Sequence, residues 1–259
     1  MMIFDSHIHT NFSADSAMLF EQAKKKADLQ GIGMITTEHL DFNYPDLADF
    51  TFDFAAYFEK YGKYRGDEVQ LGIEVGMRPG CLEQVRQIVE KYPFDYVIGS
   101  IHMVGDIDIY FDSFYQGRSK AEAYGEYFAA MLECVKTYDF IDALGHIDYI
   151  ARYGKYVDAE INYAEFQEPI DLVLKAVVEK GKAMEINTRR FGEKKVIEAL
   201  LPIYKRFRAL GGEFVTLGSD AHTPDAVGNY FAEAIAFAEA CKLQPVYFSA
   251  RKPVIMNRK

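Results

Sequence analysis

Residues 4–15 read FDSHIHTNFSAD and place two histidines at the end of an apolar run. Side chains two apart on a β-strand point to the same face, so His7 and His9 can both reach one ion. Asp15 follows shortly afterwards and offers a carboxylate, although alone it also suits the N-cap of a helix starting near Met18. The stretch therefore predicts a first strand that delivers metal ligands at its carboxyl end.

Further short apolar runs follow along the chain and alternate with longer amphipathic segments. This alternation is typical of βα units around a parallel sheet or barrel. The expected strands are Met2–His7, Met34–Thr37, Val69–Val75, Tyr96–Ile101, Ala143–Leu144, Ala183–Ile186 and Phe214–Leu217. The expected helices are Met18–Gln30, Cys81–Tyr92, Ser119–Thr137, Phe166–Lys180 and Lys195–Leu210. The absence of repeats and linkers favours one α/β barrel domain over residues 1–259.

Several turn and cap residues support these boundaries. Gly31 suits the C′ position of a helix, and Ser119 with Glu122 has the spacing of a capping box. Thr223 followed by Pro224 suits an N-cap with proline at the first helical position. These signals predict where the expected helices begin and end.

The histidines and several carboxylates fall at the ends of the expected strands. In α/β barrels the carboxyl ends of the strands converge on one rim. The predicted metal ligands are His7, His9, Asp15, His39, Glu74, His102, His146, Asp220 and His222. Imidazole and carboxylate together suit zinc, iron or manganese, and one zinc-like ion takes only about four ligands. We therefore expect two or three divalent transition-metal ions.

A single histidine near a strand end is usually an ordinary core or loop residue. Independent core histidines would not all fall on the same side of their strands, so the set as a whole indicates a metal centre. Glu38 precedes His39 and is interpreted as an outer group that holds His39 rather than as a ligand.

The composition excludes several classes of protein. The chain has 259 residues, 49% of them hydrophobic, and a net charge of −10, which disfavours non-specific binding to nucleic acid or anionic membranes. No run approaches the roughly 20 apolar residues that span a bilayer, and no targeting segment is recognised at the start. The separated cysteines Cys81, Cys134 and Cys241 predict buried thiols rather than disulfides. We expect a cytoplasmic protein without a nucleic-acid or membrane partner.

Segments spread over most of the chain resemble the polymerase-and-histidinol-phosphatase (PHP) family, and within it the histidinol-phosphate phosphatase branch. They are DSHIHT, TTEHLDF, GIEVG, GSIHMV, GHIDYIARYG, MEINTRRFG and GSDAHTP, in the family's order from residue 5 to residue 224. The resemblance implies a distorted (β/α)7 barrel with a trinuclear metal centre.

The resemblance also implies how the ligands are shared. The first metal would be held by His7, His9, Glu74 and Asp220. Glu74 would bridge to a second metal bound by His102 and His146, and the third would be held by Asp15, His39 and His222. Asp15 stands where several relatives have histidine, which implies a weaker third site or a different metal preference.

The implied activity is hydrolysis of L-histidinol phosphate to L-histidinol and phosphate, in histidine biosynthesis, by attack of a metal-bridging hydroxide. Asp220 and His222 are candidate proton donors to the leaving alkoxide. Arg152, Arg189 and Arg190 are candidate phosphate-binding residues, because guanidinium groups match phosphate bidentately. Adjacent arginines rarely face one ligand, so we expect at least one of Arg189 and Arg190 to take part; the alternative is a surface ion pair.

Other functions stay open at this point. The same scaffold serves phosphoesterases that act on nucleotides, oligonucleotide ends or phosphotyrosine, and a regulatory metal-binding domain is a non-enzymatic alternative. The expected partner is a small-molecule phosphomonoester, whose amine and imidazole require acidic or aromatic contacts. The aromatic segments 42–64 and 110–115 offer such contacts without singling out one residue. The native metals and the oligomeric state are not determined by the sequence.

Overall fold

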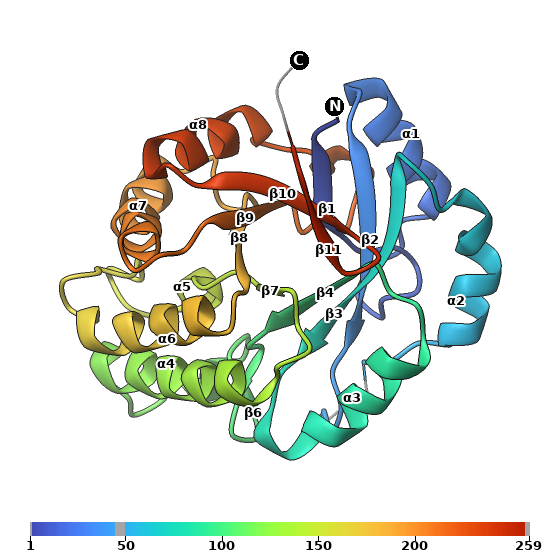
Figure 1. Cartoon of the computed structure of the whole chain (residues 1–259). Coiled ribbons are helices and arrows are strands. Elements are labelled where there is room, and N and C mark those ends of the chain that lie inside the picture. Colours follow the sequence, from blue (N-terminus) through green and yellow to red (C-terminus); the bar gives the residue numbers. More distant parts are fainter. Residues whose placement is uncertain (1, 45–49, 257–259) are drawn as a thin grey trace.

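The computed structural model describes residues 2–44 and 50–256, so residues 45–49 of the aromatic segment 42–64 lie outside the described residues. Figure 1 shows a curved sheet with helices packed around its outside. The parallel strands, in spatial order, are β1 (Phe4–Ile8), β2 (Gly33–Leu40), β3 (Val69–Gly76), β4 (Tyr96–Ser100), β7 (Ala143–Leu144), β8 (Ala183–Asn187) and β9 (Phe214–Gly218). These strands coincide with the seven that the sequence predicts, with ends that differ by a few residues.

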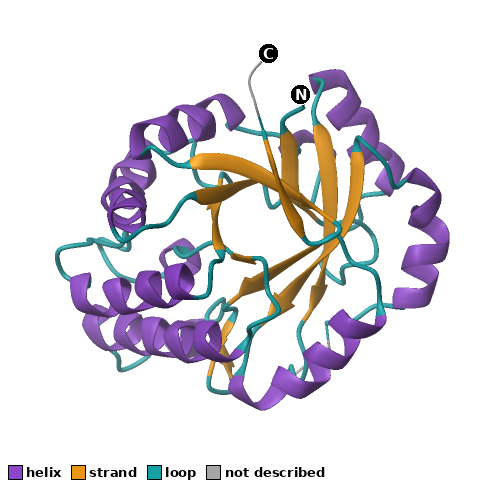
Figure 2. Ribbon diagram, in the orientation of Figure 1, coloured by secondary structure: helices purple, strands orange, loops and turns teal. Residues whose placement is uncertain are grey.

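Helices cover the outer face of this sheet (Figure 2). They are α1 (Phe20–Gln30), α2 (Phe54–Tyr61), α3 (Leu82–Lys91), α4 (Lys120–Thr137), α6 (Gln167–Glu179), α7 (Lys194–Ala209) and α8 (Phe231–Cys241). The short α5 (Tyr149–Tyr153) instead lies at the rim formed by the carboxyl ends of the strands. Short 3₁₀ turns lie at Gly62–Tyr64, Pro79–Cys81, Asp112–Phe114 and Pro224–Ala226. The expected α/β architecture is therefore confirmed.

The first and last of these parallel strands meet. The backbone N–H of His9 donates to the carbonyl of Ala221 at 2.9 Å, and the N–H of Ala221 donates to the carbonyl of His7 at 3.3 Å. Ile8 and Ala221 also form a parallel bridge. The sheet thus curls round on itself, an arrangement compatible with the distorted barrel expected from the sequence.

Two of the predicted caps form as expected, and one does not. Ser119 and Glu122 make the capping box at the start of α4, and Gly31 ends α1 with a positive φ of 66°. Thr223 makes no side-chain capping bond and precedes only the turn at Pro224–Ala226, because α8 begins later, at Phe231.

A C-terminal hairpin that the sequence analysis missed lies across the amino ends of the strands (Figure 1). It consists of β10 (Gln244–Ser249) and β11 (Lys252–Ile255), and β10 pairs with β9 only at its first two residues. Its turn uses Ala250 and Arg251, both with positive φ, where glycine or asparagine normally marks a hairpin. The turn therefore carried no recognisable sequence signal.

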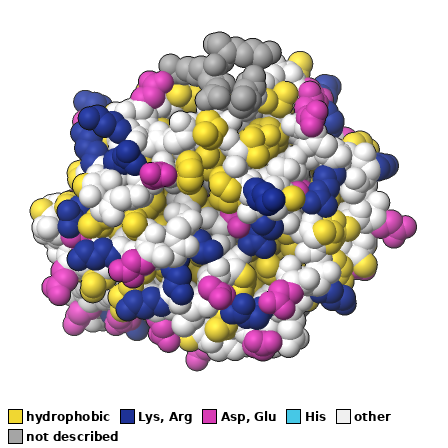
Figure 3. Space-filling model, viewed as in Figure 1, with side chains coloured by type: hydrophobic (Ala, Val, Ile, Leu, Met, Phe, Trp, Pro, Cys, Tyr) yellow, Lys and Arg dark blue, Asp and Glu magenta, His cyan; other side chains and the backbone are white. Residues whose placement is uncertain are grey.

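The buried side chains form one hydrophobic core, which includes the three cysteines. Among the described helices none combines the length and the apolar character that a membrane crossing requires. Figure 3, seen from the hairpin side, shows lysine, arginine, acidic and apolar side chains but no histidine of the described residues. The histidines gather at the other end of the strands.

Candidate metal centre

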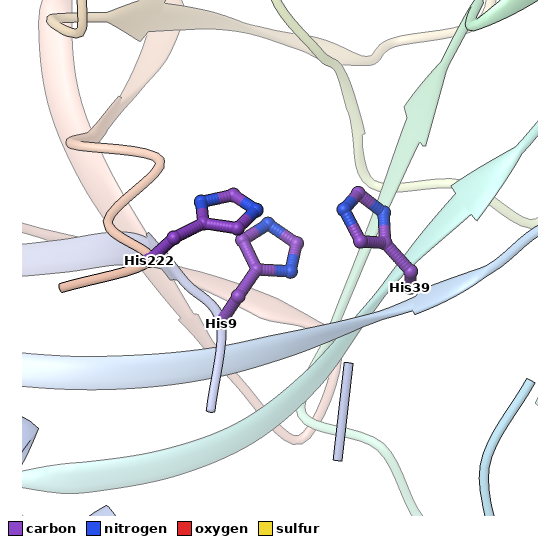
Figure 4. Close-up of side chains that lie close together, drawn as sticks. All are labelled: His9, His39 and His222. Carbon is purple, nitrogen blue, oxygen red and sulfur yellow. The ribbon is translucent and has the colours of Figure 1, made fainter. Parts of the chain in front are cut away.

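All the predicted ligands lie at or just beyond the carboxyl ends of their strands or in the loops that follow. Figure 4 shows the imidazoles of His9, His39 and His222 gathered close together although they come from three separate segments. The ring centroids of His9 lie 4.1 Å from His39 and 4.3 Å from His222. The βα topology has therefore assembled side chains from distant parts of the sequence at one rim.

Glu74 lies at the middle of this assembly and is fully buried. Its Oε2 atom lies 2.9 Å from His39 Nδ1, 3.3 Å from His7 Nε2 and 3.5 Å from His9 Nε2. Its Oε1 atom lies 2.9 Å from His146 Nε2 and 3.3 Å from His102 Nε2. One carboxylate thus contacts two separate groups of imidazoles, which is the position of a bridging ligand.

Several polar atoms at the centre have no hydrogen-bond partner among the described residues. They include Glu74 Oε2 and His39 Nδ1, which are buried and lie 2.9 Å apart without the geometry of a hydrogen bond. The Nε2 atoms of His7 and His9 also face each other at 2.9 Å. Unpaired buried polar groups are costly, so the donor set fits divalent cations, which would satisfy these atoms together.

The geometry brings together the groups that the resemblance implies. Two implied triples have ligand atoms within 4.8 Å of one another: His7, His9 and Asp220; Glu74, His102 and His146. Two triples that the resemblance does not imply are equally close: His9, His39 and His222; His39, Asp41 and His102. Asp15 Oδ2 lies 3.4 Å from His39 Nε2 and 3.1 Å from His222 Nε2. The role of each residue as a ligand stays a prediction that this placement supports.

Three outer side chains that the sequence analysis gave no role contact the far nitrogens of these imidazoles. Glu185 Oε1 lies 2.6 Å from His7 Nδ1, Asp41 Oδ1 lies 2.9 Å from His102 Nδ1, and Ser13 Oγ lies 3.0 Å from His9 Nδ1. Such contacts orient an imidazole so that its other nitrogen faces the metal. The one signal for Glu185 was an isolated carboxylate within an apolar strand.

Glu38 does not contact His39 directly, although the sequence was interpreted as placing it there to hold His39. Its carboxylate accepts hydrogen bonds from the backbone and hydroxyl of Thr10 and from the hydroxyl of Ser13. Ser13 Oγ in turn accepts from the backbone N–H of His39 at 3.1 Å. Glu38 therefore fixes the turn after β1 and reaches His39 only through Ser13.

Burial and neighbouring charges act in opposite directions on the central groups. Burial opposes ionisation of Glu74, but His7, His102 and His39 hold its pKa well below its usual value. Burial likewise opposes ionisation of Asp220, but Arg152, His7 and Arg189 hold its pKa well below the usual value. Both carboxyl groups are therefore ionised, the form in which carboxylates bind metals.

The three candidate arginines have different surroundings. Arg152 Nη1 donates to Asp220 Oδ2 at 2.9 Å, whereas Arg189 Nη1 lies 3.2 Å from Asp220 Oδ1 and from His222 Nδ1. Arg190 instead pairs with Asp148 at 3.2 Å and Glu160 at 2.5 Å. Of these three arginines, only Arg189 lines the cavity beside the centre. The placement therefore favours Arg189 as the phosphate-binding residue and does not support that role for Arg190.

A cavity of about 420 Å³ opens beside the centre. Its wall contains His39, His102 and His222 together with Asp15 and Arg189. The remaining wall is mainly aromatic and comes from the rim loops and α5: Tyr44, Phe50, Tyr110, Phe111, Tyr149 and Tyr153, with Asp41 and Asp108. The arrangement suits a small molecule that carries an anionic group toward the metal ligands.

The comparisons with known proteins agree with this geometry. Residues 5–189 match the model of the PHP domain. The chain is 48% identical over 250 residues to a probable histidinol-phosphatase of Clostridium acetobutylicum, covering 96% of this chain and 98% of that protein. It is 37% identical over 229 residues to a histidinol-phosphatase of Lactococcus lactis subsp. lactis, covering 86% and 85%.

A solved structure is similar over the same extent. The crystal structure of histidinol phosphate phosphatase from Lactococcus lactis, complexed with zinc, L-histidinol and phosphate, has a TM-score of 0.90 and 32% identity. The match covers 97% of this chain and 98% of that one. With the family model matching most of the chain and a near full-length relative at 48% identity, the protein belongs to the PHP domain family.

Proposed function

We propose that the protein is a metal-dependent phosphomonoesterase that hydrolyses L-histidinol phosphate to L-histidinol and phosphate in histidine biosynthesis. The observation that carries the proposal is the near full-length match to the Lactococcus lactis enzyme whose crystal holds zinc, L-histidinol and phosphate. The assembly of imidazoles and carboxylates around Glu74, beside a cavity of about 420 Å³, supports it independently.

The residues that would hold two or three divalent transition-metal ions are those grouped above. Glu74 would be shared between the His7–His9–Asp220 group and the His102–His146 group, and Asp15, His39 and His222 would form the third site. When bound, metal ions of this kind supply a nucleophile from water at neutral pH and neutralise charge that develops on the phosphoryl oxygens.

The residues of the chain have separate tasks in this proposal. Arg189 borders the cavity, and its Nη1 contacts Asp220 and His222. Within the described part of the chain its Nε and Nη2 make no side-chain hydrogen bond, so they can donate to a phosphoryl oxygen. Arg152 does not line the cavity and holds Asp220 in place.

The protonation of the leaving alkoxide has two candidates from the sequence, Asp220 and His222. Both carboxylate oxygens of Asp220 accept hydrogen bonds from arginines, and Asp220 does not line the cavity. His222 does line it, but its Nε2 faces Asp15 in the third site, and an imidazole nitrogen that holds a metal has no proton to donate. His222 would therefore be the proton donor only in protein whose third site holds no metal.

The function is tested by depleting the purified protein of metal with a chelator and reloading it with zinc, manganese or iron(II). Turnover of L-histidinol phosphate is then compared with that of a nucleoside monophosphate and a phosphotyrosine peptide, and bound metal is measured by elemental analysis. We expect a strong preference for L-histidinol phosphate and two or three metals per chain. Preference for another ester would contradict the substrate, and turnover by metal-free protein would contradict the metal centre.

We also propose that the enzyme works in the cytoplasm on a freely diffusing small molecule. The small-molecule substrate of the Lactococcus lactis enzyme supports this partner class. Fractionation of the producing cells is expected to recover the protein with cytoplasmic marker enzymes; recovery with the membrane fraction would contradict it.

A further inference from the structure

A short hairpin next to the metal centre carries an acidic residue into the cavity. Strands β5 (Met103–Val104) and β6 (Ile107–Asp108) pair so that Asp108 lies opposite Met103, the residue that follows His102. The N–H of Ile109 also donates to the carbonyl of His102 at 3.0 Å. The hairpin therefore holds the Asp108 carboxylate at a fixed place relative to a predicted metal ligand, and Asp108 lines the cavity.

Asp108 is buried, with 7% of its surface exposed, and its carboxylate has only neutral partners among the described residues. Oδ1 accepts from the backbone N–H of Tyr110 at 2.6 Å, and Oδ2 accepts from the hydroxyl of Tyr44. Each carboxylate oxygen can accept a further hydrogen bond. A buried carboxylate without a cation is costly, so this part of the cavity favours a positively charged ligand.

Other buried carboxylates in the structure are satisfied differently. Asp41 lies 2.9 Å from His102 Nδ1, and Asp148 pairs with Arg190. Glu38 also has neutral partners, but three donors surround it and it does not line the cavity. Among the described cavity-lining carboxylates, Asp108 therefore combines burial, a lack of a cationic partner and access to a bound molecule.

Aromatic rings complete this part of the wall. The ring centroids of Tyr110 and Tyr153 lie 5.1 Å apart, and those of Tyr153 and Tyr149 lie 5.2 Å apart. Tyr44 and Phe50 contribute a second pair at 4.8 Å. Aromatic faces attract cations and stack on flat rings, so the rings reinforce the preference set by Asp108.

On the basis of the proposed function, we propose that Asp108 determines substrate specificity by binding the cationic amine of the alcohol part of the phosphomonoester. In L-histidinol phosphate this group is the ammonium beside the CH₂–O–P linkage. Arg189 and the predicted metal ligands border the same cavity and receive the phosphate. The cavity thus selects a molecule that carries both an anionic phosphate and a cation, and it disfavours neutral esters.

The test compares the metal-loaded wild type with the Asp108→Asn variant on two substrates, L-histidinol phosphate and 4-nitrophenyl phosphate, which lacks a cation. A charge-assisted hydrogen bond in a buried site predicts that the ratio of the two kcat/KM values falls about 10- to 100-fold in the variant. Asp112→Asn is the matched control, because Asp112 lies on the same loop, is exposed and does not line the cavity. That control should leave the ratio unchanged.

A binding measurement makes the test independent of turnover of the natural substrate. Free L-histidinol should inhibit hydrolysis of 4-nitrophenyl phosphate, with an inhibition constant about tenfold higher or more in Asp108→Asn. Asp108→Glu, which keeps the charge, should retain more of the selectivity than Asp108→Asn, and thermal melts establish that each variant is folded.

The outcomes separate this inference from the proposed function. A wild type that prefers 4-nitrophenyl phosphate contradicts the function itself. If the wild type prefers L-histidinol phosphate and the ratio of kcat/KM values in Asp108→Asn is within twofold of the wild-type ratio, only the role of Asp108 is overturned. An equal fall in kcat/KM for both substrates also overturns the role of Asp108, because Asp108 would then support the β5–β6 hairpin rather than select the ligand.

Discussion

At the amino ends of the strands Arg251 donates to Asp142 at 2.6 Å and Arg65 donates to Asp95 at 2.5 Å, so both of these acids have a cation of the chain beside them. At the carboxyl ends Glu74 is surrounded by imidazoles, and His7 and His9 turn nitrogens toward each other at 2.9 Å. These two acids at the amino ends are paired by cations of the chain, whereas at the carboxyl ends Glu74 Oε2 has no hydrogen-bond partner among the described residues.

The same contrast appears in the packing. The hairpin β10–β11 stacks Tyr247 on Phe4 with ring centroids 3.8 Å apart, and Phe248 on Tyr96 at 5.3 Å. The other end leaves a cavity of about 420 Å³. One end of the strands therefore serves stability and the other serves binding, as in α/β barrels whose active sites lie at the carboxyl ends.

The largest effect is expected at the carboxyl end, from Glu74→Gln. The change keeps the size of the side chain but removes the charge that faces both groups of imidazoles. We expect kcat/KM to fall roughly 1000-fold, about 4 kcal/mol of transition-state stabilisation, with less bound metal by elemental analysis. The exposed Glu90→Gln on α3 is the control. A variant that keeps full metal content and full activity would contradict the role of Glu74 as a metal ligand.

At the amino end, Phe248→Ala should destabilise the protein without affecting catalysis. Phe248 belongs to β10 of this hairpin and is almost fully buried, and loss of such a ring lowers the free energy of unfolding by about 3 kcal/mol. Urea unfolding measures this change, and kcat of the folded variant should equal that of the wild type. Ile255→Ala, at a half-exposed position of β11, should cost much less. A large fall in kcat would show that the two ends are not independent.

A smaller effect at the carboxyl end is expected for Glu185→Gln. This change weakens the contact with His7 Nδ1 without touching the inward nitrogen. Changes of this kind lower metal affinity or activity about 10- to 100-fold. Cobalt titration followed by absorption spectroscopy measures the affinity, with the exposed Glu213→Gln as control. Equal affinity in variant and wild type would mean that Glu185 serves only packing.

The native protein is expected to show no reaction of its cysteines with thiol reagents, because all three are buried. Burial raises the pKa of Cys134 to about 12 and that of Cys241 to about 11, so little thiolate forms near neutral pH. Native protein should not react with a thiol-specific dye, whereas all three cysteines should react after unfolding in guanidinium chloride. Rapid labelling of the native protein would contradict the buried placement.

Much of the fold was predictable because its signals are local. Apolar runs such as Val69–Val75 and helix caps such as Ser119 depend on residues only a few positions apart. The hairpin β10–β11 was not predictable, because Ala250 and Arg251 adopt positive φ only where Asp95 accepts from their backbone N–H groups. The short α5 and β5–β6 elements likewise depend on packing rather than on pattern.

The sequence by itself determined that His7, His39, Glu74 and Asp220 would meet, because residue type at a strand end is local and parallel strands carry their ends to one rim. Only the tertiary structure decided the partners of these residues. Glu185 lies 178 positions from His7 in the chain, and Arg190 turns to Asp148 rather than to the cavity. Such contacts depend on distances between segments that meet only after folding, and no spacing along the chain encodes them.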